Sequence, residues 1–399
     1  MLPELDRATA VPTISVEALL DALARTGEPR AVVIDLRSPS EHAADRLPGA
    51  VSVPLFDDVE RALIGTLYRT ASPEAAFGEG RRAARAGIGA LVGAVARAAG
   101  WSAPDVDLAT RVDRLTAGGF ARLEGDLTPQ AWGAAPPGAV VLHCWRGGLR
   151  SRSVVAFLRQ LGLERAVGLA GGYKGWRAHV RGALDAWQAP PAFVLRGDTG
   201  VGKTLVLRAL EVLRPGLTVD LELLAGHRSS ILGAVGLSPC SQKAFETRLF
   251  MRLRDGFPRG AAVFEGESRK IGDAIQPARV WAALDGGVNL RLTAPRERRA
   301  EVLVADYLGR EEQRAELRAK LPFLEERLGR TKYKGVLSGL LDARRDVELA
   351  LLLLERYYDP LYAHSESGRA YAATFDAADP ARCAAELARW VEARLAGGA

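Results

Sequence analysis

The sequence predicts an α/β protein made of two consecutive domains, each built on a parallel sheet. Two stretches carry this prediction, residues 139–162 and residues 192–213. In both, a short apolar run typical of a buried strand precedes a glycine-bearing turn and then apolar residues at helical spacing. The two prolines at 190–191 can continue neither a helix nor a central strand. We therefore expect one domain over residues 1–189 and a second, with a helical C-terminal region, over residues 190–399.

Composition and charge are those of an ordinary globular protein. Hydrophobic residues make up 48% of the chain and charged residues 26%, and the net charge of +6 permits an anionic partner without requiring one. The three cysteines, Cys144, Cys240 and Cys383, are too few and too scattered for a disulfide framework, which favours a reducing compartment. No signal peptide is evident, and the longest apolar run, at 349–354, is too short to cross a bilayer. We expect a cytoplasmic protein that does not enter the membrane.

The first domain begins with a helix, a strand and a long helical insert. Ser15 can cap a helix over residues 16–25, and residues 31–34 predict a buried strand that ends at Asp35. The insert spans about residues 60–135. Its clearest helix has four apolar residues on one face, Ile88, Leu91, Val92 and Val95. We expect the insert to be a surface elaboration or a dimer contact in preference to a catalytic element.

The stretch around Cys144 predicts an anion-binding loop. A strand at 139–142 leads to Cys144, two glycines permit a tight turn, and a helix follows. Cys144 then lies below a helix N-terminus, in a loop whose amide hydrogens point inward. Arg146 and Arg150 add positive charge, so we expect a thiolate and assign catalytic roles to these three residues; a buried structural cysteine is the alternative. The other candidate site residues of this loop are Trp145, Gly147, Gly148 and Ser151.

Several motifs of the first domain resemble those of rhodaneses. They are Asp35-Leu-Arg37, Glu41-His42, Pro48-Gly-Ala50, Pro54, the loop from Cys144 to Ser151, and Gly171-Gly-Tyr-Lys-Gly-Trp176. The resemblance implies a rhodanese-like parallel-sheet domain whose cysteine carries a sulfur atom, with Asp35 and Arg37 as further candidate site residues. His143-Cys144, five further residues and Arg150 also match the signature of cysteine phosphatases, and that class is kept as an alternative.

The second domain opens with a phosphate-binding loop. Its eight residues fit the pattern G-x-x-x-x-G-K-[ST]: Gly197, Asp198, Thr199, Gly200, Val201, Gly202, Lys203 and Thr204. A strand at 192–195 precedes the loop and a helix at 205–213 follows it, as that chemistry requires. Backbone amides would wrap a phosphate chain, Lys203 would add charge, and Thr204 is the candidate ligand of a magnesium ion. The motif predicts a P-loop NTPase-like, doubly wound domain.

Other polar residues of this domain fall near the expected phosphate site. Strands predicted at 217–221 and 261–264 bring Asp220 and Glu265 to the sheet edge where ligands of such folds bind. Each acid can hold a metal through water or cap a helix, and the sequence leaves both roles open. The further candidates are His227, Arg228, Glu267 and Arg269.

Across both domains the chain resembles the tRNA 2-selenouridine synthases. The motifs are Gly65-Thr-Leu-Tyr68, Cys144-Trp-Arg-Gly-Gly-Leu-Arg-Ser151, Gly226-His-Arg-Ser-Ser230, Ser241-Gln242, Phe264-Glu-Gly-Glu-Ser268 and Tyr358-Asp-Pro-Leu-Tyr362. The resemblance implies a transferase that acts on 2-thiouridine at the wobble position of certain tRNAs. Such an enzyme transfers a geranyl group from geranyl diphosphate to the sulfur and then replaces S-geranyl with selenium from selenophosphate.

The resemblance also implies partners and co-substrates. These are tRNA, selenophosphate, geranyl diphosphate, magnesium and an enzyme that produces selenophosphate; the oligomeric state does not follow from the sequence. We expect the phosphate loop to hold a diphosphate-bearing ligand such as geranyl diphosphate, because the usual aspartate at the end of the magnesium-binding strand is absent. Two rival classes are an ATP-dependent rhodanese-type sulfurtransferase and a non-enzymatic sensor in which nucleotide gates a persulfide-reading domain.

Overall fold

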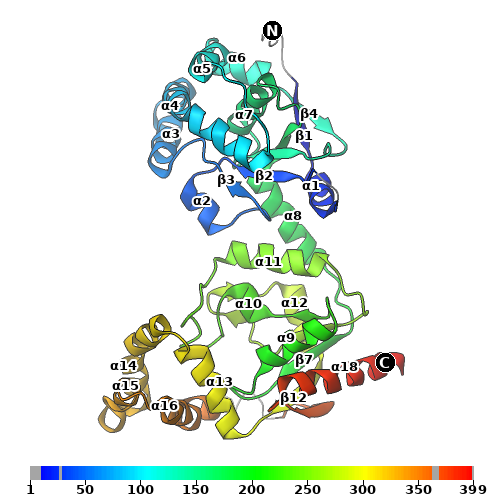
Figure 1. The fold of residues 1–399 in the computed structure, drawn as a ribbon, viewed down its shortest axis with the longest axis vertical. Coiled ribbons are helices and arrows are strands. Elements are labelled where there is room, and N and C mark those ends of the chain that lie inside the picture. The colour runs from blue at the N-terminus through cyan, green and yellow to red at the C-terminus, as the bar shows by residue number, and fades with distance from the viewer. Residues whose placement is uncertain (1–9, 27–28, 362–367, 398–399) are drawn as a thin grey trace. The chain divides into compact units, whose positions relative to one another are not determined.

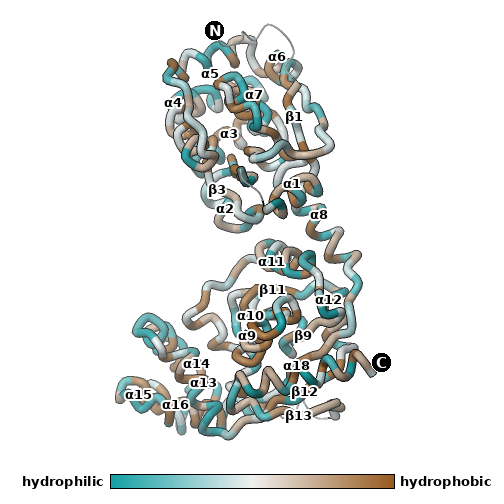
Figure 2. Tube along the Cα trace, turned by 45° about the vertical axis from the view of Figure 1, so that its right-hand side comes forward, coloured by the Kyte–Doolittle hydropathy of each residue, from teal (hydrophilic) through white to brown (hydrophobic). Residues whose placement is uncertain are grey.

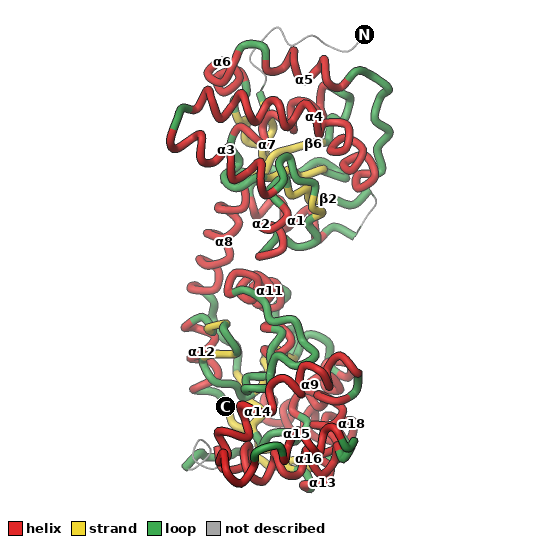
Figure 3. The backbone as a smooth tube through the Cα atoms, turned by 90° about the vertical axis from the view of Figure 1, so that its left-hand side faces the viewer, coloured by secondary structure: helices red, strands yellow, loops and turns green. Residues whose placement is uncertain are grey.

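A computed structural model describes residues 10–26, 29–361 and 368–397 of the chain (Figure 1). The chain divides into two compact units, residues 1–182 and residues 183–399, and the division falls within one helix. Each unit contains strands surrounded by helices, as the colouring of Figure 3 shows. No helix in the described ranges is long and apolar enough to span a bilayer. The last residue of the Tyr358–Tyr362 motif lies outside the described residues.

The first unit is a parallel α/β sheet with a helical insert. Its elements are β1 (Val11–Ile14), α1 (Val16–Ala24), β2 (Val32–Asp35), α2 (Pro39–Ala44), β3 (Val51–Ser52), α3 (Asp58–Thr70), α4 (Pro73–Ala99), α5 (Leu108–Thr116), α6 (Gly119–Asp126), β4 (Pro129–Trp132), β5 (Val140–His143), α7 (Leu149–Gln160), β6 (Ala166–Leu169) and α8 (Gly172–Ala186). The strand order is β3-β2-β5-β6-β1-β4, and every neighbouring pair is parallel. This confirms the parallel α/β architecture expected from the sequence.

The insert consists of α3 to α6, after which β4 joins the edge of the sheet beside β1. Asp57 caps α3, and the hydroxyl of Ser72 accepts a hydrogen bond from Ala75 N at the start of α4. The four apolar residues predicted to share one face of α4 are all buried, in a core that also contains Ile34, Leu142 and the inner face of α7. The insert therefore covers one face of the sheet, because its long helix supplies part of the main core.

The second unit contains a five-stranded parallel sheet and a group of C-terminal helices. Its elements are β7 (Ala192–Arg196), α9 (Lys203–Leu213), β8 (Thr218–Val219), α10 (Leu221–Ala225), α11 (Gln242–Arg254), β9 (Ala262–Glu265), β10 (Lys270–Ile271), β11 (Ala274–Ile275), α12 (Ala278–Asp285), β12 (Val288–Thr293), α13 (Arg296–Leu308), α14 (Glu311–Tyr333), α15 (Val336–Asp342), α16 (Asp346–Leu353), η1 (Leu354–Tyr358), β13 (Ala373–Asp376) and α18 (Pro380–Ala396). The sheet order is β13-β12-β7-β9-β8. The phosphate-loop strand β7 is central, as in a doubly wound fold.

Two separate cores stabilise this unit. One joins the sheet to α9 and α18 and includes Leu207, Leu210 and Leu387. The other lies among α13 to α16, whose apolar and polar residues alternate along the tube in Figure 2. The C-terminal helices are therefore held by an apolar core of their own.

Candidate active site

The Cys144 loop (residues 144–151) connects the end of β5 to the start of α7. Cys144 itself is only 2% exposed. Its Sγ lies 3.3 Å from the hydroxyl oxygen of Ser151, whose one hydrogen can be donated either to the sulfur or to the carbonyl oxygen of Gly148 at 3.2 Å. The backbone N–H groups of Arg146 and Ser151 point at the same sulfur. The predicted arrangement, a cysteine at a strand end within a ring of donors, is present.

The electrostatics of the loop favour a thiolate. Burial on its own would raise the pKa of Cys144, but the charge of Arg150, the Ser151 hydroxyl and the two backbone N–H groups together lower it below its ordinary value. The thiol of Cys383 behaves oppositely, because burial in the core raises its pKa to about 12. Of these two buried cysteines, Cys144 has the environment expected of a reactive thiol.

Two glycines allow the segment that begins at Gly171 to pack directly against the Cys144 loop. Gly147 has a φ of +64°, and a Cβ there would lie 2.7 Å from the carbonyl oxygen of Leu169. A Cβ on Gly172 would lie 2.5 Å from the carbonyl oxygen of Cys144. The N–H of Tyr173 donates to that same carbonyl. The two glycine motifs thus pack directly against each other, and larger residues would separate them.

Asp35 and Arg37 lie beneath the loop as structural supports. They form a fully buried ion pair with a separation of 2.6 Å. The guanidinium of Arg37 stacks 3.8 Å from the ring centroid of Tyr173, whose ring in turn packs against Trp145. Neither Asp35 nor Arg37 lines the cavity above Cys144, so their contribution is to hold the aromatic residues that support the loop.

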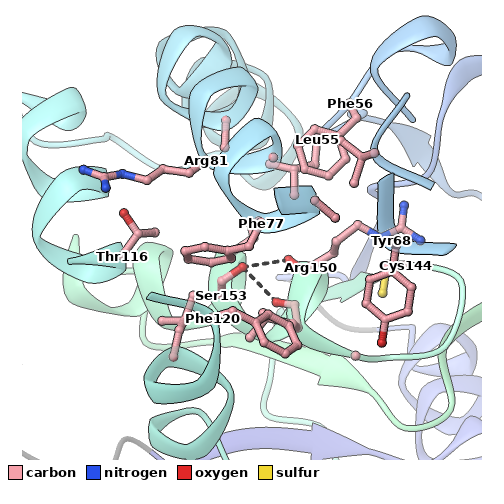
Figure 4. A pocket seen from close by; sticks show the side chains of 18 of the residues that line it. Leu55, Phe56, Tyr68, Phe77, Arg81, Thr116, Phe120, Cys144, Arg150 and Ser153 are labelled. Carbon is pink, nitrogen blue, oxygen red and sulfur yellow. Dashed lines mark hydrogen bonds between the residues drawn. The ribbon is translucent and has the colours of Figure 1, made fainter. Parts of the chain in front are cut away.

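A cavity of about 600 Å³ opens from the Cys144 loop into the insert, and we call it the insert cavity. Figure 4 shows Cys144, Arg150 and Tyr68 at one end, the rings of Phe77 and Phe120 in the middle, and Arg81 toward the other end. Its apolar wall comes mainly from α3 to α7, with these members: Leu55, Phe56, Ile64, Ile88, Val112, Leu115, Leu123, Val154 and Phe157.

The insert therefore forms part of the wall of a pocket that Cys144 also lines, whereas the sequence favoured a surface elaboration or a dimer contact. In the sequence, the Gly65–Tyr68 motif indicates only a resemblance to a family. The structure places Gly65 and Tyr68 in the wall of the insert cavity. The aromatic residues Phe77 and Phe120 were missed, because nothing in the sequence shows which face of the insert meets the Cys144 loop.

The phosphate loop (residues 197–204) has the expected strand–loop–helix geometry. Gly197, Gly200 and Gly202 have φ values of +147°, +76° and +92°, a region that favours glycine. The ammonium of Lys203 folds back to the carbonyl oxygen of Gly197 at 3.1 Å. Together, the loop amides, Lys203 and the N-terminus of α9 form a site for an anion such as a phosphate group.

Arg299 holds the phosphate loop against the C-terminal helices. Its Nε donates to the carbonyl oxygen of Thr199 at 2.9 Å, and its guanidinium lies 3.6 Å from Asp198. Asp359 pairs with the same guanidinium from the other side. The Tyr358–Tyr362 motif thus includes a carboxylate that positions the arginine bracing the loop.

Acidic residues gather around Thr204. Its hydroxyl donates to Oε1 of Glu265 at 2.6 Å and lies 3.5 Å from Glu222. Burial, followed by the charge of Glu222 and other nearby acids, raises the pKa of Glu265 well above its ordinary value. Burial and the charge of Glu267 raise the pKa of Glu222 to about 8. Glu222 belongs to the site and was not singled out from the sequence.

The remaining candidates have different surroundings. Asp220 caps α10, accepting a hydrogen bond from Leu223 N at 2.7 Å. Arg228 donates to the carbonyl oxygen of Val235 and stacks on Tyr307, so its contacts are structural. The ring of His227 is confined by two glycines and borders a second cavity with Lys270.

Glu267 and Arg269 follow β9, the strand that ends at Glu265. Glu267 is buried beside the Thr204 acids and adds its charge to theirs, whereas Arg269 is exposed. Of the predicted residues, the structure thus groups Glu265, Glu267 and Asp220 near Thr204, and Asp220 also caps α10.

Two anion-binding loops, one with the buried thiol of Cys144 and one with Lys203, define a rhodanese-like domain joined to a P-loop domain. Residues 190–394 match the family model described as the tRNA 2-selenouridine synthase AAA domain. The tRNA 2-selenouridine synthase of Chromohalobacter salexigens is 30% identical over 83% of this chain and 87% of its own length. That of Cupriavidus pinatubonensis is 32% identical over 86% of this chain and 91% of its own. The chain belongs to the tRNA 2-selenouridine synthase family.

Among solved structures, the chain is similar to the N-terminal domain of an ATP/GTP-binding protein from Clostridium difficile 630. The match covers 42% of this chain and 98% of that domain, with 23% identity and a TM-score of 0.29. At that TM-score the similarity carries no argument about function.

Proposed function

We propose that this protein converts 2-thiouridine at the wobble position of tRNA to 2-selenouridine, through an S-geranyl intermediate. The observation that carries the proposal is the buried Cys144 thiol with a lowered pKa, beside two arginines, in a chain that also has a complete phosphate loop. Membership of the tRNA 2-selenouridine synthase family, whose members are named for this product, supports the proposal.

The first step converts the sulfur at C2 of the base into a better leaving group. The sulfur of the thiouridine bonds to C1 of geranyl diphosphate, the C1–O bond breaks, and diphosphate leaves with the electron pair. The base loses its N3 proton to solvent, which gives a neutral S-geranyl base. The sulfur can then leave as geranylthiolate, whereas from the thiocarbonyl it would have to leave as sulfide.

The second step exchanges sulfur for selenium. Water takes up the phosphoryl group of selenophosphate, and the selenide so released bonds to C2 of the base while geranylthiolate departs. We assign the selenium anion to the Cys144 loop. The donors that lower the pKa of Cys144, chiefly Arg150, the Ser151 hydroxyl and the N–H of Arg146, favour any anion held there.

The phosphate loop serves a phosphate-bearing ligand, and its surroundings fit magnesium. Oxygen atoms are the ligands that magnesium prefers, and Thr204 and Glu265 present theirs within 2.6 Å of each other. No group of three or more His, Cys, Asp or Glu side chains in the described part of the chain can hold a metal ion alone. Thr204, Glu265 and the ligand's own phosphate would therefore share the ion, which would neutralise phosphate charge.

The cysteine phosphatase alternative has less support, because the chain belongs to the tRNA 2-selenouridine synthase family. A phosphatase of that type needs an acid to protonate the leaving group. Among the residues that line the insert cavity beside Cys144, the one carboxylate is that of Glu124, on α6. The buried Asp35–Arg37 pair supports the loop from below.

Mass spectrometry of modified nucleosides tests the proposal. The full-length protein is incubated with tRNA that carries 2-thiouridine, first with geranyl diphosphate and then with selenophosphate. We expect the S-geranyl nucleoside in the first sample and 2-selenouridine in the second, and no 2-selenouridine with Cys144→Ser. Sulfur addition to unmodified tRNA that depends on ATP would support the sulfurtransferase instead, and an unchanged nucleoside would contradict both.

A further inference from the structure

The insert cavity is larger and more apolar than a site for a selenium or sulfur anion requires. A loop of inward-pointing amides already suffices for such an anion. The cavity has about 600 Å³, within the range of pockets that enclose a small organic molecule. We propose that it binds the hydrocarbon chain of an allylic diphosphate, with the diphosphate and the reacting carbon beside Cys144. This inference rests on the proposed function and assigns its first step to the first unit.

The wall of the cavity fits a branched hydrocarbon chain. Phe77 and Phe120 face each other edge to face at 6.1 Å, and Phe157 and Ile88 are almost fully buried behind them. Figure 4 shows the two rings between the Cys144 end and the Arg81 end. Burying the apolar surface of a ligand against such residues favours binding.

Positive charge is concentrated at the Cys144 end. Arg61 of the wall pairs with Glu41, and Arg81 shares the single carboxylate of Asp113 with Arg85. Arg69, also in the wall, is exposed on α3. Arg146 and Arg150 have no carboxylate partner among the described residues, and Arg150 is the charge that most strongly favours the Cys144 thiolate. An anionic head group is therefore attracted to this end of the cavity and a hydrocarbon tail to the middle.

This polarity suits the chemistry of the transfer. As the C1–O bond breaks, negative charge moves onto the diphosphate, where Arg146 and Arg150 can stabilise it. The prenyl carbon atoms develop positive charge at the same moment, and the aromatic ring of Tyr68 lies at this end of the cavity. A prenyl chain packed against the apolar wall would leave less room for water, which would otherwise capture the allylic cation.

The inference departs from the expectation that the phosphate loop holds geranyl diphosphate. That loop lies beside the acidic residues Glu222 and Glu265 and the ion pairs of Arg299. Such surroundings suit phosphate groups with a cation, whereas the insert cavity offers a surface for the hydrocarbon half of the ligand. The two placements predict opposite results for variants of the two units.

The test compares two tryptophan variants of α4 in the full-length protein. Ala84 is half-buried and lines the cavity, so Ala84→Trp fills it; Ala86 is exposed on the same helix and does not line it. Calorimetry with geranyl diphosphate should show binding at least 10-fold weaker in Ala84→Trp and unchanged in Ala86→Trp. With inorganic diphosphate as the probe, both should stay within about 2-fold of wild type.

Lys203→Ala separates the two placements. If the cavity is the donor site, Lys203→Ala still binds geranyl diphosphate like wild type. Loss of binding in Lys203→Ala together with retention in Ala84→Trp would assign the donor to the phosphate loop and overturn the inference. A wild-type protein that forms no S-geranyl nucleoside contradicts the proposed function, whereas one that forms it with Ala84→Trp unaffected contradicts the cavity assignment alone.

A second variant covers the case in which Ala84→Trp does not fold. Phe120→Ala enlarges the middle of the cavity from its half-buried ring position. It should raise the affinity for the fifteen-carbon farnesyl diphosphate relative to geranyl diphosphate by at least 5-fold, with the thermal unfolding midpoint as the check on folding. An unchanged ratio in folded Phe120→Ala would also overturn the inference.

Discussion

The Cys144 loop and the phosphate loop share one backbone design but have opposite electrostatic surroundings. Each follows a buried parallel strand, contains at least one glycine with positive φ and leads into a helix N-terminus. Beside the Cys144 loop, Arg146 and Arg150 have no carboxylate partner among the described residues. Beside the phosphate loop, Glu222 and Glu265 crowd against Thr204.

The difference shows that a ring of backbone amides determines the sign of the ligand's charge but not its chemical class. Backbone donors and the helix dipole attract an anion in both loops. The neighbouring side chains then select the ligand. Arginines with no carboxylate partner in the described ranges, together with an apolar wall, suit an anion with a hydrocarbon tail, whereas buried acids suit phosphate accompanied by a cation. The predictions below test each side of this contrast.

The largest effect is expected at the thiol. Cys144→Ser should lower 2-selenouridine formation by more than 100-fold, because the serine hydroxyl stays protonated where the thiol becomes a thiolate. Cys240→Ser and Cys383→Ser should retain the activity. Alkylation of single-cysteine variants at a series of pH values should give a midpoint for Cys144 below the free-thiol value of about 8.5.

Either of two results would contradict the assignment of the thiol. One is a Cys144 that titrates like a free thiol, and the other is a Cys144→Ser protein with full selenation. Because burial raises the pKa of Cys383 to about 12, that thiol provides the slow-reacting reference.

A smaller effect is expected from the arginine that braces the phosphate loop. Arg299→Ala removes the hydrogen bond to Thr199 and the ion pair with Asp198. The probe is thiophosphate or ATP, whichever binds to the wild-type protein in the presence of magnesium. Its binding should weaken by about 10-fold in Arg299→Ala, as expected for the loss of a charge-assisted contact.

Arg298→Ala is the matched control for that experiment. Arg298 lies on the same helix but pairs with Glu301, so its removal should change binding by less than about 2-fold. Since Arg299 is buried, the thermal unfolding midpoint of both variants must be measured. Equal binding by the two folded variants would show that the loop needs no brace.

The buried acids predict a pH dependence of stability. The pKa of Glu222 is raised to about 8 by burial and by the charge of Glu267. Below about pH 4.5 both folded and unfolded states carry the proton; as the pH rises toward 8, the unfolded state loses it and the folded state keeps it. The free energy of unfolding should therefore fall across this window by on the order of a few kcal/mol, and Glu222→Gln should remove much of the fall.

Urea unfolding at pH 5, 6.5 and 8 in EDTA measures this effect. Glu326→Gln, an exposed position on α14, is the control for loss of a carboxylate elsewhere. Magnesium should restore stability at pH 8 in wild type and less so in Glu222→Gln. The same pH profile in Glu222→Gln and wild type would mean that the Thr204 acids do not share this buried environment.

The sequence predicted the two loops because each is local. Strand, glycine turn and helix follow one another within about 25 residues, so spacing alone placed Cys144, Lys203 and their neighbours. Spacing also predicted the apolar face of α4, whose residues Ile88 and Val95 are buried. Such features depend on hydrophobic periodicity and on the conformational freedom of glycine.

What the sequence could not show depends on contacts between distant segments. The insert cavity needs Phe77, Phe120 and Phe157 to converge from three helices, and no local pattern specifies how those helices pack. Arg299 and Asp359 are likewise sixty residues apart. Sequence spacing also could not decide whether Asp220 caps a helix or holds a metal, because both roles use the same residue type at a strand end.

The smallest predicted effect concerns arginines that could hold tRNA phosphates. Arg269 is exposed and has no carboxylate partner among the described residues. Arg296 lies 3.5 Å from Asp359 and 3.8 Å from Glu355.

A phosphate contact releases counterions only if the arginine carries net charge toward the nucleic acid. Arg269→Ala should therefore flatten the salt dependence of tRNA binding by about one unit of log–log slope. Arg296→Ala should change the slope by less than half of that, because the two nearby carboxylates, which Arg299 and Arg356 share, offset part of its charge. Filter binding of the full-length protein between 50 and 200 mM salt measures both slopes, and equal changes would show that local ion pairing does not decide which arginines meet the RNA.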